Sequence, residues 1–363
     1  METPPAAIAR RCAEQLCSEG WAVLDSCLGH SEALELQKEA QRLEAAGLME
    51  AHRFEFAAEG ERREYQHQGR SFLDFEPPPP AAALPLAPGL AAFAGGGFAA
   101  QLAAELTARQ PKLALSGQVQ VKLQLTRGLR GSAPCHYDTS DTAPLRQVTL
   151  LLYLGQWQED YAAELVLQPF LGGAVSVAPL FNRAVVFLSD RMLHSSLAPK
   201  DAQARRWLLT LWLHGERVDS VDAHLAPSPW PPLLQRLLAP AVYAELFMEA
   251  LERSMPPGPA LEALKAAQQE EIASIEMDES FAAACHSLEG FACCAFFERG
   301  ISSKKSVLGC MSTWKGVILT VNMKGTCLTS TPLRLVSGLQ HSGFVLVLCG
   351  PEFVYAAWCQ MAD

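Results

Sequence analysis

Long apolar runs are scarce in this sequence of 363 residues. The most apolar late stretch, Phe344–Trp358, is interrupted by Gly350-Pro-Glu352 and is shorter than the ~20 residues that a membrane-spanning helix needs. The first residues carry charges without an apolar core behind them, so no secretory signal is predicted. We therefore expect no membrane partner and a cytoplasmic or nuclear location.

An excess of basic residues is also lacking, because 29 Lys and Arg stand against 39 Asp and Glu, for a formal net charge of −10. Surfaces that bind nucleic acid through its phosphates are basic, so no nucleic-acid partner is expected. None of the eleven cysteines has CxxC spacing, and we expect reduced thiols. A zinc site from Cys285, His286, Cys293 and Cys294 is disfavoured, because adjacent pairs lack the spacing of a tetrahedral clamp.

Residues 1–114 are predicted to form a helical support region. Leucines recur in Ser31–Met49 among good helix formers, and Phe98–Arg109 predicts a second helix. Prolines and glycines between residues 76 and 97 predict a loop or linker. The polar run Arg62–Arg70 is either a mobile substrate loop or a solvated surface, and such runs are more often the latter.

Between Val119 and His214 the pattern becomes that of strands. Apolar and polar side chains alternate over residues 119–126, as in a half-buried strand. Further strands are expected at 147–154, 164–170, 174–177, 184–189 and 206–214. Short strands separated by turns predict an α+β fold whose core, residues 115–216, is a double-stranded β-helix, or jelly roll, with helices on both flanks.

Residues 217–284 are expected to be a helical extension, with helices at Trp230–Met255 and Ala260–Met277. Residues 285–363 are expected to form a small Cys-rich appendage, with candidate strands at 316–321 and 344–348. No motif in it indicates a role, and the sequence leaves the oligomeric state open. The length suits one large domain with an appendage, or two domains.

His136 and Asp138 are two residues apart at an expected strand or strand end, so both side chains project from one face. That spacing alone is weak evidence, since a turn could hold the same residues. His194 strengthens it, because it follows the strand at 184–189 after a short turn and can come from a facing strand. Two histidines and one carboxylate are the ligands that non-haem Fe(II) oxygenases use.

Strand periodicity places Arg206, Leu208, Thr210 and Trp212 on one face of the strand 206–214. An arginine that points into a barrel needs an anionic partner, because an unpaired buried charge is very costly. A dicarboxylate ligand would supply one through a bidentate pair. The alternative is a structural salt bridge or an arginine exposed at the strand start.

Together these segments resemble the prolyl 4-hydroxylase-type Fe(II)/2-oxoglutarate dioxygenases, and above all their oxygen-sensing prolyl hydroxylase branch. The resemblance covers roughly residues 115–215 well and the preceding helices faintly. The matching segments are Val148–Gly155, Ala163-Glu-Leu165, Val177–Asp190, His194 and Arg206-x3-Thr-x-Trp212. Two positions depart from the family: Ala162-Ala163 stands where Gly-Gly is usual, and Gly155 where Asn is common. The collagen branch has Lys at the position of Arg206, which points away from that branch.

The resemblance implies an oxidoreductase with Fe(II), 2-oxoglutarate, O2 and ascorbate as cofactors. It implies that His136, Asp138 and His194 bind iron, that Arg206 and Tyr153 bind the distal carboxylate of 2-oxoglutarate, and that Thr210 lines the pocket. The implied reaction hydroxylates an unactivated C–H bond and releases succinate and CO2. A peptidyl proline in a protein or peptide is the first choice of substrate.

Three alternatives stay open: a hydroxylase of a free small molecule, an enzyme acting on alkylated nucleic acid, and a catalytically silent jelly-roll binding module. The nucleic-acid relatives carry a second arginine where this chain has Trp212, and the acidic charge balance also disfavours them. A silent barrel would not need to keep both the metal ligands and the arginine.

Overall fold

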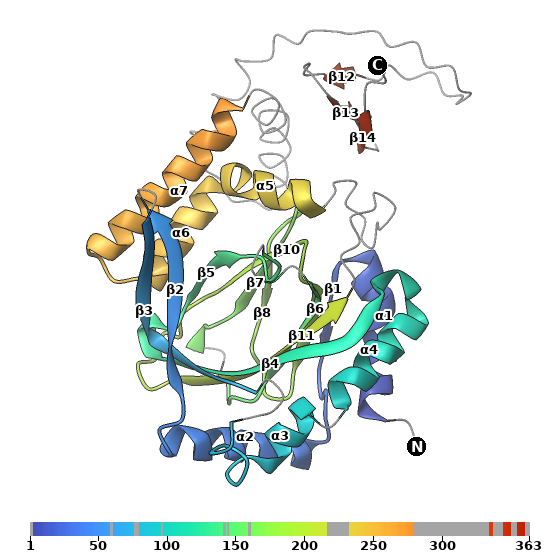
Figure 1. Cartoon of the computed structure of the whole chain (residues 1–363), viewed down its shortest axis with the longest axis vertical. Helices are drawn as coiled ribbons and strands as arrows, with labels where there is room; N and C mark the ends of the chain where they lie inside the picture. Colours follow the sequence, from blue (N-terminus) through green and yellow to red (C-terminus); the bar gives the residue numbers. More distant parts are fainter. Residues whose placement is uncertain are drawn as a thin grey trace. The chain divides into compact units, whose positions relative to one another are not determined.

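The computed structural model describes residues 3–58, 61–75, 80–95, 97–140, 143, 145–158, 161–215 and 232–278, and three strands between 334 and 359 (Figure 1). The chain divides into two units. The first comprises Met1–Phe170, Ala174–Pro227 and Glu245–Gln268, and the second comprises Leu171–Gly173, Ser228–Ala244 and Gln269–Asp363.

Two antiparallel sheets form the core of the first unit. The large sheet has the order β1-β9-β6-β11-β4-β3-β2 and the small sheet β5-β10-β7-β8. The large sheet comprises β1 (Trp21–Leu24), β2 (Glu50–Ala58), β3 (Glu61–Asp74), β4 (Leu115–Arg127), β6 (Arg146–Tyr153), β9 (Ala184–Leu188) and β11 (Arg205–Gly215). The small sheet comprises β5 (Ala133–His136), β7 (Leu165–Pro169), β8 (Val175–Val177) and β10 (Met192–Ser196).

The sheets face each other and share an apolar cluster that includes Leu151 and Phe187 from the large sheet and Leu167 and Met192 from the small one. They do not close into a continuous barrel. The prediction of an α+β fold with a jelly-roll core is confirmed. The predicted strands at 147–154, 164–170, 174–177, 184–189 and 206–214 correspond to β6, β7, β8, β9 and β11.

Four helices cover the outer face of the large sheet: α1 (Pro4–Ser18), α2 (His30–Ala45), α3 (Pro88–Gly95) and α4 (Phe98–Arg109). Short 3₁₀ turns follow at Pro111–Leu113 and Gly128–Arg130. Residues 207, 209, 211 and 213 of β11 pack with these helices in one cluster, while Leu208 belongs to the cluster between the sheets. The outward face of β11 is therefore entirely apolar, whereas the inward face combines Leu208 and Trp212 with the polar Arg206 and Thr210.

The expectation of a loop or linker over residues 76–97 is wrong for residues 88–95, which form α3. Glu39 on α2 explains why a helix begins there. Its buried carboxylate accepts hydrogen bonds from the backbone N–H groups of Gly89 (2.8 Å) and Leu90 (2.6 Å). A carboxylate at a helix N-terminus satisfies otherwise unpaired donors and complements the helix dipole.

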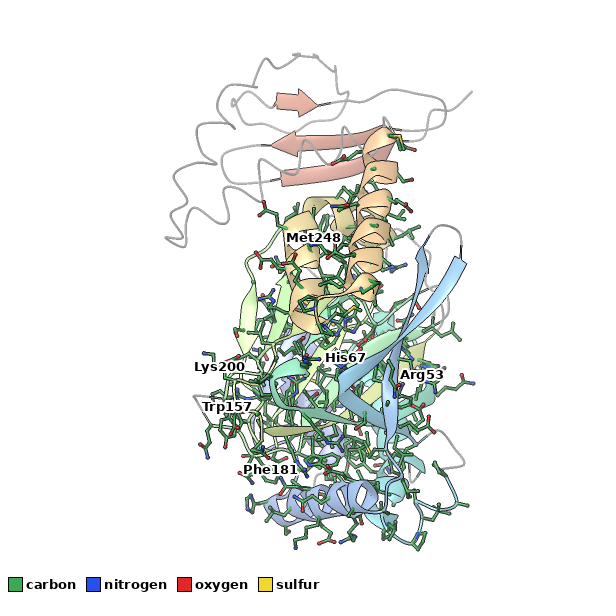
Figure 2. The ribbon with its side chains drawn as sticks, turned by 90° about the vertical axis from the view of Figure 1, so that its left-hand side faces the viewer. Arg53, His67, Trp157, Phe181, Lys200 and Met248 are labelled. Atoms are coloured by element: carbon green, nitrogen blue, oxygen red, sulfur yellow. The ribbon has the colours of Figure 1, made fainter. Side chains whose placement is uncertain are left out.

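The expectation that the first hundred residues are helical is wrong in part, because β1, β2 and β3 lie there. Strands β2 and β3 form a hairpin, with Arg53 on the first and His67 on the second (Figure 2). The polar run Arg62–Arg70 is part of β3, so the interpretation as a mobile loop is wrong. Its Glu and Gly residues have low strand propensity, and pairing with β2, and with β4 from Arg70 onward, stabilises the extended form.

Beyond the jelly roll the structure has α5 (Pro232–Val242), α6 (Ala244–Ser254) and α7 (Pro259–Met277). The single helix predicted over Trp230–Met255 is therefore wrong: Pro240 lies inside the last turn of α5, where a proline weakens helix continuation. Strands β12 (Arg334–Val336), β13 (Phe344–Cys349) and β14 (Val354–Cys359) form a small antiparallel sheet.

The candidate strand at 344–348 is confirmed by β13. The candidate strand at 316–321 and the four residues of the disfavoured zinc site lie outside the described residues. Among the described helices, none combines the length and the apolar character needed to cross a membrane.

Candidate metal centre

Two neighbouring strands of the small sheet bring the predicted histidines together. Strand β5 ends at His136, and β10 carries His194 at its middle; the antiparallel register pairs the two residues directly. Their ring centroids are 4.3 Å apart. Asp138 follows β5 by two residues and is buried beside them.

The three side chains form one cluster. Asp138 Oδ1 lies 3.6 Å from His136 Nε2 and 3.9 Å from His194 Nε2. One ligand atom from each residue falls within 4.8 Å of the others, and this is the group of described residues that could hold a metal ion. Two imidazoles and one carboxylate leave positions open for further ligands, as a catalytic metal requires.

The backbone fixes the orientation of both imidazoles. The Nδ1 atoms of His136 and His194 lie 2.9 Å and 3.1 Å from the carbonyl oxygens of Pro134 and Met192. A carbonyl can only accept, so each Nδ1 carries the proton and each Nε2 presents a lone pair to the cluster. The His136 side chain is 43% exposed. Desolvation of its ring, with His194 beside it, lowers the pKa of His136 to about 4, so the ring is neutral at pH 7.

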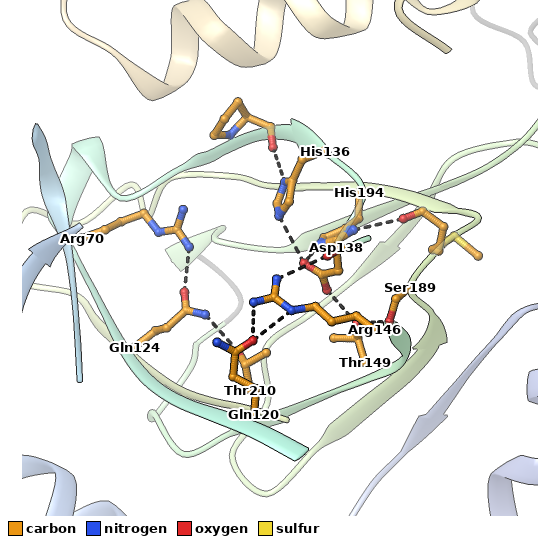
Figure 3. A network of polar contacts seen from close by, with 12 residues as sticks. Arg70, Gln120, Gln124, His136, Asp138, Arg146, Thr149, Ser189, His194 and Thr210 are labelled. Carbon is orange, nitrogen blue, oxygen red and sulfur yellow. Dashed lines mark hydrogen bonds and ion pairs between the residues drawn. The ribbon is translucent and has the colours of Figure 1, made fainter. Parts of the chain in front are cut away.

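Asp138 is held by the neighbouring strands. Its Oδ2 accepts a hydrogen bond from the Thr149 hydroxyl (2.7 Å), whose oxygen lies 2.8 Å from Ser189 Oγ (Figure 3). This leaves Oδ1 facing the histidines. Burial by itself would raise the pKa of Asp138, but the two histidines and the Thr149 hydroxyl outweigh it and lower the pKa. The carboxylate is therefore ionised at neutral pH and able to bind a cation.

A cavity of about 340 Å³ opens beside this cluster and is lined by both sheets. All six residues predicted for the site line it: His136, Asp138, Tyr153, His194, Arg206 and Thr210. The predicted periodicity of β11 is confirmed, since Arg206, Leu208, Thr210 and Trp212 face this cavity.

Arg206 is 6% exposed and lies deep in the pocket. Its guanidinium donates to the Ala163 carbonyl (2.6 Å) and to the Thr126 and Ser196 hydroxyls (3.2 and 3.0 Å). Its Nε has no hydrogen-bond partner among the described residues, and none of their carboxylates forms an ion pair with it. The alternative of a structural salt bridge is therefore wrong within the described chain, and the group suits an anionic ligand.

Tyr153 and Thr210 complete the inner wall. Tyr153 is 1% exposed, and burial raises the pKa of its phenol to about 12, so it is a neutral hydrogen-bonding group. The Thr210 hydroxyl accepts a hydrogen bond from Gln124 Nε2 (3.0 Å). Arginine, phenol and hydroxyl together suit a carboxylate.

Ala162 and Ala163, which replace the usual Gly-Gly, both adopt left-handed backbone conformations, with φ of 54° and 69°. Glycine would enter this region without strain, whereas alanine does so at a cost. The chain keeps the conformation that glycines favour, and with it the Ala163 carbonyl that binds Arg206.

Residues 123–214 match the model of the 2OG-Fe(II) oxygenase superfamily. A prolyl 4-hydroxylase from Phytophthora capsici is similar over 80% of this chain and 95% of its own, with 26% identity and a TM-score of 0.64. The family match and this similarity support a 2-oxoglutarate-dependent dioxygenase of prolyl 4-hydroxylase type. None of the curated proteins matches it in sequence.

Two further prolyl hydroxylases resemble this dioxygenase more distantly. One, from Pseudomonas putida, has 19% identity and a TM-score of 0.46 over 57% of this chain and 99% of its own. The other is from Trichoplax adhaerens, in complex with a peptide fragment of the hypoxia-inducible factor oxygen degradation domain. It has 21% identity and a TM-score of 0.48 over 60% of this chain and 94% of its own.

Sequence reasoning missed several residues of the dioxygenase pocket. Thr149 and Ser189 hold Asp138, and Arg70 and Arg146 line the cavity. Thr149 is the one polar residue in the apolar run Val148–Leu152 of β6, a signal that could have marked it. Arg70 lies in the polar run Arg62–Arg70, which the sequence left open as a substrate loop or a solvated surface, and its place in the pocket follows from pairing between distant segments.

We expect the substitution Thr149→Val to weaken metal binding about 10–100-fold, because Asp138 loses the hydrogen bond that orients it. Titration of the protein with Fe(II) under nitrogen measures the effect. Thr107→Val is the matched control: the Thr107 hydroxyl accepts from the backbone of Leu115, away from the centre. Unchanged metal affinity in Thr149→Val would contradict the orienting role.

Ala163→Gly should raise the free energy of unfolding by about 0.5–1 kcal/mol, because it relieves the left-handed strain by more than it adds to unfolded-state entropy. Ala104→Gly, on the exposed face of α4, should lower it by about 1 kcal/mol. Urea unfolding followed by circular dichroism compares the two. If both substitutions lower the free energy of unfolding, residue 163 is not strained.

Proposed function

We propose that the protein hydroxylates an unactivated C–H bond in a peptidyl proline, with Fe(II) held by His136, Asp138 and His194. The observation that carries the proposal is the cluster of these three ligand atoms within 4.8 Å, in one pocket with a buried arginine that lacks a counterion. The donor set suits Fe(II), and the arginine suits the dicarboxylate 2-oxoglutarate.

Each residue has a defined task in this proposal. The two imidazoles offer Nε2 to the metal while their Nδ1–H groups donate to backbone carbonyls. Asp138 offers Oδ1 and stays ionised through the Thr149 hydroxyl. Arg206 binds the distal carboxylate of 2-oxoglutarate, with help from Tyr153, and Thr210 lines the pocket.

Bound iron, with 2-oxoglutarate and O2, supplies an oxidation that places one oxygen atom in the substrate C–H bond and the other in succinate, with release of CO2. The protein contributes position and charge: it orients the ligands and aligns the co-substrate. Leu151, Leu165 and Leu208 line the same cavity and limit its water content.

A proline in a protein or peptide is the proposed substrate because the Phytophthora capsici protein, similar over 80% of this chain, is a prolyl 4-hydroxylase. Ascorbate is proposed as the reductant that keeps the iron ferrous. A reducing compartment, cytoplasm or nucleus, is the proposed location. It suits the four described cysteines, Cys12, Cys17, Cys27 and Cys135, which are all free thiols.

Iron-loaded wild-type protein should release succinate from 2-oxoglutarate and add one oxygen atom to proline-containing peptides, whereas Asp138→Ala should do neither and should lose bound iron. Succinate is measured directly, peptides by mass spectrometry and iron by elemental analysis. Asp25→Ala, at an exposed ion pair with Arg183, is the control. Full iron occupancy and turnover in Asp138→Ala would refute the ligand assignment. Oxygen gain on a free small molecule but on no peptide would refute the peptidyl substrate.

Arg206→Ala should weaken 2-oxoglutarate binding by ~3–5 kcal/mol, because a buried carboxylate loses its charge partner. Calorimetry on metal-loaded protein under nitrogen measures the affinity, and thermal unfolding checks that the variant folds. Arg205→Ala is a matched control, since Arg205 is the preceding residue of β11 and pairs with Glu44. Equal affinities in the wild type and Arg206→Ala would contradict the anchor role.

A further inference from the structure

A second arginine reaches the pocket from the polar run on β3. Arg70 pairs in register with Thr126 of β4, and its side chain lines the cavity that holds the metal ligands. Its guanidinium donates to Gln124 Oε1 (2.7 Å), and Gln124 in turn donates to Thr210 (Figure 3). These neutral partners fix the direction of the guanidinium without neutralising its charge.

Arg70 has no counterion among the described residues. None of their carboxylates lies within ion-pair distance of it, and its Nε is buried without a hydrogen-bond partner. Three other cations line the cavity, and Arg206 is the proposed anchor of 2-oxoglutarate. Lys122 pairs with Asp74 (3.3 Å), and Arg146 donates to Gln120 and to the Asp138 carbonyl.

The ligands of the proposed reaction leave this charge unbalanced. Fe(II) is neutralised by Asp138 and one carboxylate of 2-oxoglutarate, and Arg206 by the other carboxylate. Arg70 therefore stays positive in a partly buried site, which is costly without an anion. Burial and the nearby Arg206 lower the pKa of Arg70 to about 10, so it is still charged at pH 7.

We propose that Arg70 determines substrate specificity by binding the carboxylate of an Asp or Glu side chain close to the hydroxylated proline. The inference rests on the proposed function and adds to it the chemical class of the peptide. A guanidinium held by neutral groups beside the reacting centre can form a charge-assisted, bidentate pair with such a carboxylate. Substrates with a neutral residue at that position leave the charge unpaired.

The test uses proline-containing peptides in matched pairs, in which each other position in turn is Glu or Gln. Binding is measured by fluorescence anisotropy on full-length protein loaded with Mn(II) and 2-oxoglutarate under nitrogen, and hydroxylation by mass spectrometry with Fe(II) in air. Wild-type protein should bind one Glu peptide roughly tenfold more tightly than its Gln partner, a difference of about 1.4 kcal/mol. In Arg70→Gln this ratio should fall to about one, and Arg70→Lys should retain part of it.

Arg109→Gln is the control, because Arg109 lies on α4 and pairs with Glu105, so the Glu preference should persist.

Calorimetry of 2-oxoglutarate binding supplies a second readout. A loss of 2-oxoglutarate affinity in Arg70→Gln comparable to that in Arg206→Ala would overturn the proposal, since Arg70 would then serve the co-substrate. Wild-type protein that hydroxylates Glu and Gln peptides equally would overturn this inference alone. Wild-type protein that neither binds nor hydroxylates any peptide would overturn the peptidyl substrate as well.

Discussion

The antiparallel pairing of β5 with β10 places His136 opposite His194, and the metal centre depends on this register. Successive side chains of a strand point to opposite faces, so a slip of one residue would turn His194 away from its partner. The pairing of β10 with β7 on its other side holds the strand in place. Asp138 then needs only the two residues after β5 to reach the histidines, with Thr149 to orient it.

The same alternation gives β11 two faces: the outward face packs against the helices and stabilises the fold, and the inward face carries residues of the site. Its outward leucines are fully buried against the N-terminal helices, and each such side chain contributes roughly 1.5–3 kcal/mol. That burial offsets the cost of placing Arg206 on the opposite face, where the Ala163 carbonyl and two hydroxyls share its charge. A strand with weaker outward packing would tolerate a buried arginine poorly.

The jelly-roll strands and the inward face of β11 could be predicted from local periodicity. The three proposed ligands could be predicted from residue type, from the positions of His136, Asp138 and His194 at strand ends, and from the family resemblance. Features that depend on distant contacts were missed. Helix α3 begins where Glu39, 50 residues away from Gly89, satisfies its first N–H groups. Arg70 reaches the pocket through the pairing of β3 with β4, and its strand has the composition of a surface loop. The proposed domain boundaries stay a prediction.

Two arginines line one cavity, and we propose separate roles for them: Arg206 binds the co-substrate and Arg70 binds a substrate anion. The central claim is that His136, Asp138 and His194 bind the metal. A crystal structure of the protein loaded with Mn(II) and 2-oxoglutarate under nitrogen, with anomalous scattering at the manganese edge, tests it most directly. The account predicts one anomalous peak bonded to His136 Nε2, His194 Nε2 and an oxygen of Asp138. A peak elsewhere, or none at full metal loading, would contradict it.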